Sequence, residues 1–299
     1  MFTVVAKEEL APKVFLFEIE APRVARKHQA GQFVIVRPFD TSERIPLTIA
    51  DSDAVNGTIT LVVQAVGKTT EEMADRIHVG DALANLAGPL GNATHIDFPK
   101  HPGIERGTVV CVAGGIGAAP ILPIAKAFHR AGHEVLTIAG ARSKNLLILE
   151  DRLTAASTRV LFSTDDGTRG WHGFVTDVLK SLIREQRSAG GDVHLVVAIG
   201  PGPMMRATAE TTRPFEVPTL VSLNTIMVDG TGMCGGCRVT VGGAVKYVCV
   251  DGPEFDGHNV DWAAMMRRQA MYKTEEQESL ARYQHACELD ALEAREESA

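Results

Sequence analysis

Short runs of alternating apolar and polar residues fill the first third of the chain. The runs FTVVAKEEL, KVFLFEIEA, GQFVIVRPF, IPLTIADS and GTITLVVQAVG follow one another between residues 2 and 97, with turn residues between them. A period of two is typical of half-buried β-strands, and no long amphipathic helix interrupts the series. The pattern predicts a small antiparallel barrel or sandwich, and we expect a β-barrel over residues 1–99.

The pattern changes after residues 99–107, where proline and glycine interrupt the chain. Continuous apolar runs such as GTVVCVAGG, HEVLTIAGAR and DVHLVVAIG then occur together with segments of helical period, APILPIAKAFHRAG and FVTDVLKSLIREQR. Buried strands that alternate with helices predict a parallel sheet with crossover helices. We therefore expect residues 100–221 to form an α/β domain of the nucleotide-binding type.

Residues 222–258 are rich in glycine and too few for a large core, and they contain three of the five cysteines. A bound metal cluster would supply the stabilisation that such a segment lacks. Residues 259–299 are rich in Met, Ala, Glu and Arg, which predicts one or two helices and a solvated tail. The expected fold is therefore a multidomain α+β chain with a barrel, a parallel-sheet domain, a small cluster segment and a helical tail.

Composition and charge narrow the function. A hydrophobic fraction of 45% and a charged fraction of 22% in 299 residues are typical of a soluble globular protein with more than one domain. The net charge of −7 and the absence of a Lys/Arg run disfavour a nucleic-acid partner. The N-terminus lacks a signal-peptide pattern and no apolar run reaches about 18 residues, so we expect a cytoplasmic location without membrane insertion.

The clustered cysteines predict an iron-sulfur site. Cys234 and Cys237 lie in the glycine-rich string MVDGTGMCGGC, and Cys249 follows a hairpin with the sequence RVTVGGAVKYVC. Asp229 precedes Cys234 by five positions, which reproduces the plant-type C-x4-C-x2-C spacing with aspartate as the first ligand. The expected ligands of a 2Fe-2S cluster are thus Asp229, Cys234, Cys237 and Cys249. A zinc site, or an aspartate that only caps the loop, stays open as an alternative.

Two segments of the predicted barrel are candidates for binding FAD. In RIPLTIAD, residues 44–51, an arginine can neutralise a phosphate and the residues after the proline can lie against a planar ring. VGKTT, residues 66–70, opens a helical stretch whose backbone amides and hydroxyls can hold a pyrophosphate. The segment GKTT is not the end of a P-loop, because the earlier glycine of that motif is missing from the sequence. The FAD candidates are Arg44, Pro46, Leu47, Thr48, Gly67, Lys68, Thr69 and Thr70.

The glycine-rich turn AGGIGAAP, residues 113–120, lies between a strand and a helix, which is the context of a dinucleotide site. A turn that is merely tight is the alternative. Three later segments, GAR, STDDG and IGPGPMM, follow successive strands, where open α/β sheets bind ligands. The NAD(H) candidates are Gly114, Gly115, Gly117, Ala118, Pro120, Gly140, Arg142, Asp165, Asp166, Gly200, Pro201 and Met204. The two aspartates suit a turn equally well, and Arg142 with Lys144 leaves NADH or NADPH open.

The order of these motifs resembles the ferredoxin-NADP reductase-like electron-transfer flavoproteins. Within them, MVDGTGMCGGCRVTVGG followed by VCVDGPEFDGH resembles the electron-transfer subunit of class B dihydroorotate dehydrogenase. It is more similar to the alpha (small) subunit family of NADH-dependent reduced ferredoxin:NADP oxidoreductases, also described as sulfide dehydrogenase flavoprotein subunits. Asp229 favours this second resemblance, because the dihydroorotate dehydrogenase subunits have cysteine at that position.

The resemblance implies FAD, a 2Fe-2S cluster, NAD(H) and an oxidoreductase that needs no catalytic side chain, because hydride transfer occurs at the flavin. It also implies an electron-bifurcating complex with a larger, glutamate synthase small-subunit-like partner that carries another flavin and 4Fe-4S clusters and meets ferredoxin. A redox-sensing FAD/2Fe-2S module is the other interpretation. The apolar residues of the tail can either dock on a partner or pack on their own chain. They are Trp262, Met265, Met266, Met271 and Tyr272.

Overall fold

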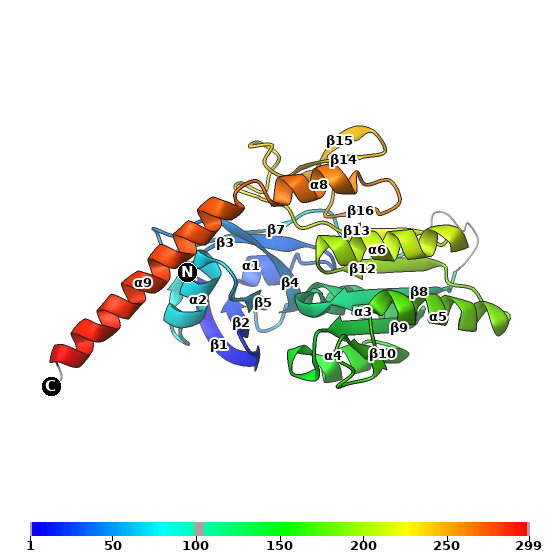
Figure 1. The fold of residues 1–299 in the computed structure, drawn as a ribbon, viewed down its shortest axis with the longest axis horizontal. Coiled ribbons are helices and arrows are strands. Elements are labelled where there is room, and N and C mark those ends of the chain that lie inside the picture. Colours follow the sequence, from blue (N-terminus) through cyan, green and yellow to red (C-terminus); the bar gives the residue numbers. More distant parts are fainter. Residues whose placement is uncertain (1, 99–104, 298–299) are drawn as a thin grey trace.

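In a computed structural model, the described residues form two β-sheets with helices against them, a small hairpin and a pair of C-terminal helices (Figure 1). The structure describes residues 2–98 and 105–297, with side chains up to residue 289. The expected fold class is confirmed, since an antiparallel barrel precedes a largely parallel sheet with helices. The expected boundary between residues 99 and 100 lies outside the described residues.

The N-terminal sheet closes on itself. Its strands pair antiparallel in the order β6-β1-β2-β5-β4-β3-β7. They are β1 (Phe2–Ala11), β2 (Val14–Glu20), β3 (Phe33–Arg37), β4 (Ile45–Asp53), β5 (Thr58–Gln64), β6 (Ala82–Leu83) and β7 (Asn85–Leu90). Only Ala84 separates β6 from β7 in sequence although they lie at opposite edges of this order, so the edges meet. Phe17, Ile19, Ile49 and Leu61 fill the interior.

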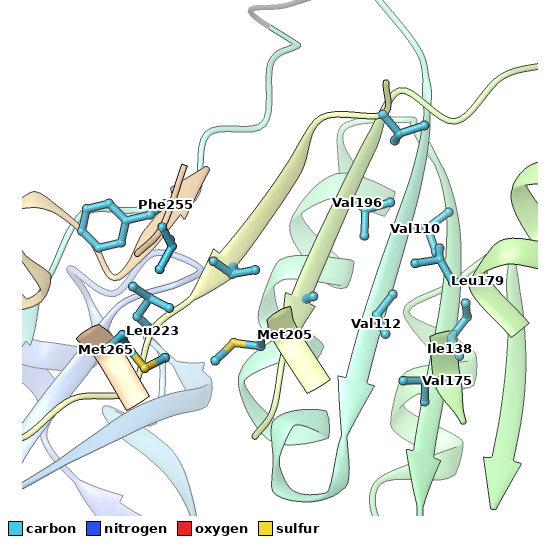
Figure 2. Close-up of a cluster of buried hydrophobic side chains, with 14 of the residues drawn as sticks. Val110, Val112, Ile138, Val175, Leu179, Val196, Met205, Leu223, Phe255 and Met265 are labelled. Carbon is cyan, nitrogen blue, oxygen red and sulfur yellow. The ribbon is translucent and has the colours of Figure 1, made fainter. Parts of the chain in front are cut away.

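The second sheet has the order β11-β10-β9-β8-β12-β13-β16, and all of its pairs are parallel except the last. Its strands are β8 (Thr108–Gly114), β9 (Glu134–Ala141), β10 (Arg159–Thr164), β11 (Trp171–His172), β12 (Leu195–Ile199), β13 (Thr219–Ser222) and β16 (Glu254–Asp256). Its residues alternate between two apolar layers, because neighbouring side chains of a strand point to opposite faces. Val110 and Val112 of β8 face Leu179 of a helix on one side (Figure 2), and Val109 and Cys111 belong to the other layer.

The helices lie against the two sheets or at the C-terminus. They are α1 (Pro22–Ala25), α2 (Lys68–Arg76), α3 (Ala118–Arg130), α4 (Glu150–Ala155), α5 (Val175–Ser188), α6 (Gly202–Thr212), α7 (Val248–Asp251), α8 (Trp262–Gln269) and α9 (Lys273–Glu297). Short 3-10 turns are η1 (Gly115–Gly117), η2 (Lys144–Leu146) and η3 (Arg213–Phe215). Within residues 2–98 and 105–297, no helix is long and apolar enough to cross a membrane.

The cysteine-rich segment shares a core with the second sheet. Its hairpin consists of β14 (Arg238–Val241) and β15 (Ala244–Tyr247), and the chain then returns to the sheet as β16. Cys237, Val239 and Cys249 are buried in the same apolar layer as Val110. The expectation that a metal cluster must replace a missing core is therefore too strong, because neighbouring elements supply apolar contacts.

The C-terminal helices behave differently from one another. Met265 of α8 is buried, with Trp262 and Met266 packed beside it in the layer that contains the cysteines. Met271 and Tyr272, which follow α8, are about half exposed. The helix α9 runs past α2 and away from the body (Figure 1), and the Tyr283 hydroxyl lies 3.2 Å from Asp75 Oδ2. The tail thus packs on its own chain at its start and leaves Met271 and Tyr272, together with Leu289 of α9, on the surface.

Polar contacts join the barrel to the second sheet. Lys126 of α3 lies 2.5 Å from Asp51 of β4. The Thr94 hydroxyl, which follows the barrel strands, donates to Glu254 Oε1 of β16 at 2.6 Å. Removal from water disfavours a carboxylate, and this raises the pKa of Glu254 to about 7. Ionisation of Glu254 at higher pH therefore destabilises the contact between the barrel and the second sheet.

We expect Glu254→Gln to stabilise the protein more at pH 8 than at pH 5. In the folded protein the Glu254 carboxyl keeps its proton up to about pH 7, whereas the ordinary pKa of a glutamate is 4.5. Wild-type stability therefore falls as the pH rises through this window, and the glutamine avoids a loss of about 1 to 3 kcal/mol. Denaturant unfolding at the two pH values measures the difference, with the exposed Glu9→Gln as the control. An equal effect of Glu254→Gln at both values would contradict the assignment.

Candidate functional site

A cleft with a volume of about 180 Å³ lies between the barrel and the second sheet. One wall is formed by residues 46–48 of β4, and the opposite wall includes Gly117, Pro120 and Gly200. The structure therefore brings the central residues of the predicted FAD motif beside part of the predicted NAD(H) motif. A planar ring system held against the first wall would face a ligand held by the second.

A third wall of the cleft was missed by sequence reasoning. It contains Ser222, the last residue of β13, then Leu223, Asn224 and Met227 after that strand, and Pro253, which precedes β16. Ligands commonly bind beyond the carboxyl ends of parallel strands, and β13 is such a strand. The position of this segment after the strand run PTLVS was the available signal.

The strand β4 positions the barrel side of the cleft. Its hydrogen-bonded partner β3 places Phe33 opposite Thr48, and Phe33 also lines the cavity. Leu47 and Thr48 are partly buried, which leaves an apolar and a hydroxyl surface toward the cavity. Arg44 is exposed just before β4 and does not line the cleft. The predicted ring-facing residues and the predicted phosphate-binding arginine therefore lie in different environments.

The other FAD candidates form the start of α2. The Thr70 hydroxyl accepts from the amides of Val66 at 3.1 Å and Gly67 at 3.0 Å and donates to the Gly67 carbonyl. The Thr69 hydroxyl donates to Glu43 at 3.3 Å. Both hydroxyls thus stabilise the local fold. What this site can offer a phosphate is the N-terminal end of the helix, with its partial positive charge, and the ammonium group of Lys68.

The glycines of the turn between β8 and α3 serve different purposes. A Cβ atom on Gly117 would lie 2.1 Å from the Ile199 carbonyl oxygen, and one on Gly114 would lie 2.4 Å from Met204 Sδ. These two glycines are required by packing within the chain. Gly115 has a φ of +55°, and a Cβ there would meet nothing within 4 Å. Its backbone is therefore open to an approaching ligand, as a nucleotide site requires.

Met204 of α6 joins two parts of the predicted NAD(H) site. Its sulfur also lies 2.9 Å from a Cβ built on Gly200, so its side chain covers both glycine turns. Pro201 is the N-cap of α6, and Ala118 is buried at the start of α3. Gly140 is required by packing, because its Cβ would meet Val175 at 2.2 Å. These residues shape the edge of the sheet by contacts with the chain itself.

Asp165 and Asp166 follow β10 and lie beside the end of β9. Their amides donate to the carbonyls of Ala141 and Arg142, each at 3.1 Å. The Asp166 carboxylate accepts from the Thr168 hydroxyl at 2.6 Å and the Thr168 amide at 3.0 Å, which lowers the pKa of Asp166. Asp166 is therefore committed to a turn, while the side chains of Asp165 and Arg142 are exposed.

The four predicted cluster ligands form two pairs. Asp229 Oδ1 lies 3.1 Å from Cys234 Sγ, and the sulfur atoms of Cys237 and Cys249 lie 3.2 Å apart. No three His, Cys, Asp or Glu side chains among the described residues are grouped for a single metal ion. A two-iron cluster uses two protein ligands on each iron, and the two pairs meet that requirement.

The loop around the pairs has a donor set suited to a negatively charged cluster. The Gly236 amide lies 3.4 Å from Cys234 Sγ. The Cys234 thiol, the Thr231 hydroxyl and the Met233 amide donate to the Asp229 carboxylate and hold its pKa well below the usual range. Asp229 is therefore an anion at neutral pH, as a metal ligand must be.

The other two cysteines lie apart from this loop. Cys111 is fully buried in β8, where burial raises the pKa of its thiol to about 12. Such a thiol stays protonated and is a poor ligand. Cys287 is exposed on α9. Neither side chain is therefore an alternative ligand to the two pairs.

Comparisons with known proteins point to one family. Residues 224–261 match the model of the iron-sulfur cluster binding domain of dihydroorotate dehydrogenase B. A Thermotoga maritima protein named as a homolog of the dihydroorotate dehydrogenase B (NAD(+)) electron transfer subunit is 44% identical over 280 residues, 94% of each chain. A Clostridium beijerinckii protein, described as an uncharacterized protein in the adh 3' region, is 48% identical over 276 residues, 92% of each chain.

A solved structure extends this likeness to the fold. The structure of an NADH-dependent reduced ferredoxin-NADP oxidoreductase, studied for flavin-based electron bifurcation, matches with a TM-score of 0.86 and 42% sequence identity. The match covers 95% of this chain and 98% of that chain. The similarity in sequence and in fold thus spans nearly the full length of both proteins.

Proposed function

The chain belongs to the family of dihydroorotate dehydrogenase B electron transfer subunits and their homologues, and we propose that it is the electron-transfer flavoprotein subunit of an NADH-dependent reduced ferredoxin:NADP oxidoreductase. It is an oxidoreductase subunit that uses FAD, NAD(H) and a 2Fe-2S cluster. Identity of 42% over nearly the whole chain supports this assignment. The complex is an electron-bifurcating heterodimer in this proposal.

The observation that carries the proposal is the cleft shared by β4 and the turn before α3. Residues 46–48 hold the flavin ring on one side, and Gly117, Pro120 and Gly200 guide the nicotinamide to the other. When bound, FAD exchanges hydride with NAD(H) and single electrons with the cluster, which links two-electron to one-electron chemistry. The chain's own part is orientation and exclusion of water, and no side chain has to move a proton.

Some of the remaining candidates bind the outer parts of the two cofactors in this proposal. Arg44, Lys68 and the first turn of α2 neutralise the FAD phosphates, while the open backbone at Gly115 accepts the NAD(H) diphosphate. In this proposal residues 1–99 bind FAD, 100–221 bind NAD(H), and 222–258 hold the cluster, with 259–299 as the helical tail.

The two ligand pairs hold one iron each in this proposal. Asp229 and Cys234 form the outer pair, with Cys234 exposed, and Cys237 and Cys249 form the buried pair. The buried sulfur pair borders the core of the second sheet. The outer pair, in which Cys234 is exposed and Asp229 is partly buried, is not part of that core, so in this proposal the cluster has one side toward this chain and one side open to a partner.

Exposed apolar side chains around the cluster loop support an electron-transfer partner. They are Val228, Met233, Val245, Tyr247 and Val250. Met233 is 87% exposed although it directly precedes a cluster ligand. Grouped apolar exposure of this kind is typical of protein interfaces. We propose that the larger, glutamate synthase small-subunit-like partner docks here, carries another flavin and 4Fe-4S clusters, and passes electrons to ferredoxin in the cytoplasm.

Native purification tests the partner. We expect the chain to elute in size exclusion together with a larger iron-sulfur flavoprotein, and Met233→Glu to release it because a carboxylate would be buried at the interface. Exposed Val55→Glu on the barrel is the matched control. A monomeric wild-type chain with full physiological activity would contradict the partner proposal. Cell fractionation of the same material tests the cytoplasmic location.

The electron transfer subunit of dihydroorotate dehydrogenase B is the second candidate, since several relatives carry that name. Asp229 argues against it, because those subunits are expected to have cysteine there. Dihydroorotate-dependent reduction of the native complex would favour this second candidate, whereas NADP-dependent reoxidation in the presence of ferredoxin would favour the first.

Anaerobic titration of the purified full chain with NADH tests the proposed chemistry. We expect NADH to bleach the flavin absorption and then to produce the EPR signal of a reduced 2Fe-2S cluster. A parallel titration with NADPH gives the nucleotide preference. If neither nucleotide bleaches the flavin, the chain is a redox-sensing module and the enzymatic proposal is wrong.

Replacement of Asp229 tests direct ligation. Asp229→Cys should keep the cluster but change its midpoint potential and EPR spectrum, because ligand identity sets both. Asp229→Ala should lower the iron content, since one pair loses a member. Thr231→Val is the control, because it removes only the hydrogen bond to the Asp229 carboxylate. An unchanged potential and spectrum in Asp229→Cys would mean that the aspartate is no ligand.

A further inference from the structure

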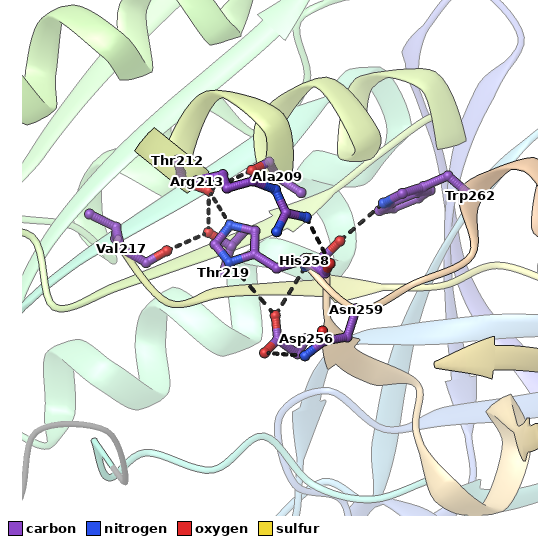
Figure 3. A network of polar contacts seen from close by, with 10 residues as sticks. Ala209, Thr212, Arg213, Val217, Thr219, Asp256, His258, Asn259 and Trp262 are labelled. Atoms are coloured by element: carbon purple, nitrogen blue, oxygen red, sulfur yellow. Dashed lines mark hydrogen bonds and ion pairs between the residues drawn. The ribbon is translucent and has the colours of Figure 1, made fainter. Parts of the chain in front are cut away.

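Helix α8 is fixed at its beginning to the second sheet. Figure 3 shows the polar network that does so: the Thr212 hydroxyl lies 2.9 Å from His258 Nε2, and Arg213 donates to the His258 carbonyl at 2.7 Å. The Trp262 indole donates to the Gly257 carbonyl at 3.0 Å. The carboxylate of Asp261 caps the helix through the Ala264 amide. The start of α8 is therefore held by side chains from the end of α6, from η3 and from the segment after β16.

The other end of α8 reaches both functional regions. Arg268 donates to the Gly236 carbonyl at 2.9 Å, between Cys234 and Cys237 in the cluster loop. Gln269 donates to the Asn224 carbonyl at 2.5 Å, and Asn224 lines the flavin cleft. Since Met265 is buried in the core between these ends, the helix cannot slide freely. Neighbouring residues of one helix thus hold the cluster loop and the third wall of the cleft.

Arginines hold two of the three peptides between Cys234 and Cys237. Arg238 donates to the Gly235 carbonyl at 3.0 Å, and the Gly236 amide of the same peptide points to Cys234 Sγ at 3.4 Å. In a trans peptide the carbonyl and the amide point in opposite directions, so fixing one aims the other. By the same geometry, the bond from Arg268 to the Gly236 carbonyl fixes the next peptide, so the Cys237 amide points away from the Arg268 guanidinium.

We propose that Arg268 is a positioning residue of the iron-sulfur site, which aims the Cys237 amide and places a fixed positive charge beside the loop. This inference rests on the proposed function, because it requires a cluster at the two ligand pairs. Reduction adds one electron, and hence one negative charge, to the site. A nearby cation and inward amides stabilise that added charge and raise the midpoint potential.

Arg267 offers a matched control for charge alone. It precedes Arg268 on the same helix and is exposed, whereas Arg268 is partly buried. Arg268 also lines a cavity of about 120 Å³ with Arg238 and Met265. Arg268→Gln and Arg267→Gln each remove one positive charge, and only the first removes the bond to the Gly236 carbonyl.

The test is a dithionite titration of the full chain followed by EPR. We expect the midpoint potential to fall in Arg268→Gln, to fall less in Arg268→Lys, and to stay near the wild-type value in Arg267→Gln. The EPR spectrum should change only in the Arg268 variants. Iron content, FAD content and thermal unfolding of each variant show whether it folds and loads its cofactors.

Each outcome decides the inference. Equal shifts in Arg268→Gln and Arg267→Gln would overturn it, because charge alone would then explain the effect. If Arg268→Gln does not fold, a wild-type potential and spectrum in Arg268→Lys would overturn it, and a lowered potential would support it. A folded Arg268→Gln chain that binds FAD but no iron also supports it. A wild-type chain without any 2Fe-2S signal would instead refute the proposed function itself.

Discussion

The rest of the structure depends on the apolar contact between α3 and the barrel. Ala118, Ala119 and Leu122 of this helix are buried in one layer with Ala50 and Val62 of the barrel strands. Small side chains at the start of α3 let the strand β4 approach closely, and the Lys126–Asp51 pair borders the same contact. Because β4 and the glycine turn are rigidly attached to the two sides of this layer, the cleft keeps its width. Two cofactors can be held at a fixed separation only if the two walls of the cleft are joined by a rigid apolar layer of this kind.

The sequence predicted the architecture well because each part has its own hydrophobic period. Alternating runs predicted the barrel, and continuous runs with helices predicted the parallel sheet. The pattern could not show that β16 returns to that sheet, since three residues carry no usable period. Nor could it distinguish the glycines of AGGIGAAP. Glycine is required at 117 because a side chain would collide with the Ile199 carbonyl, and at 115 because the backbone φ is positive. The sequence does not distinguish these two requirements.

For the candidate site, the sequence showed the local motifs but not the contacts between residues far apart in the chain. Crowding and spacing selected the three cysteines, and spacing together with the family resemblance selected Asp229. The structure arranges the four residues as two pairs. The hydroxyls of Thr69 and Thr70 were expected to hold a phosphate. In the structure, Thr70 caps the start of α2, because helix capping competes for the same group, and Thr69 donates to Glu43. The contact of Arg268 with the cluster loop could not be predicted from the sequence, since Arg268 lies 32 positions from the carbonyl that it binds.

The cluster segment shows how a small insertion can be rigid without a core of its own. Cys237 and Cys249 are buried in the layer that also contains Val110 and Met205, so the inner ligand pair takes its packing from the second sheet. The outer pair has no such support, because Cys234 is exposed and Asp229 is held mainly by its own loop. The Gly236 carbonyl lies between the two pairs and is bound from outside the loop, by α8. The helix α8 therefore transmits the rigidity of the core to the part of the loop that lies between the two ligand pairs.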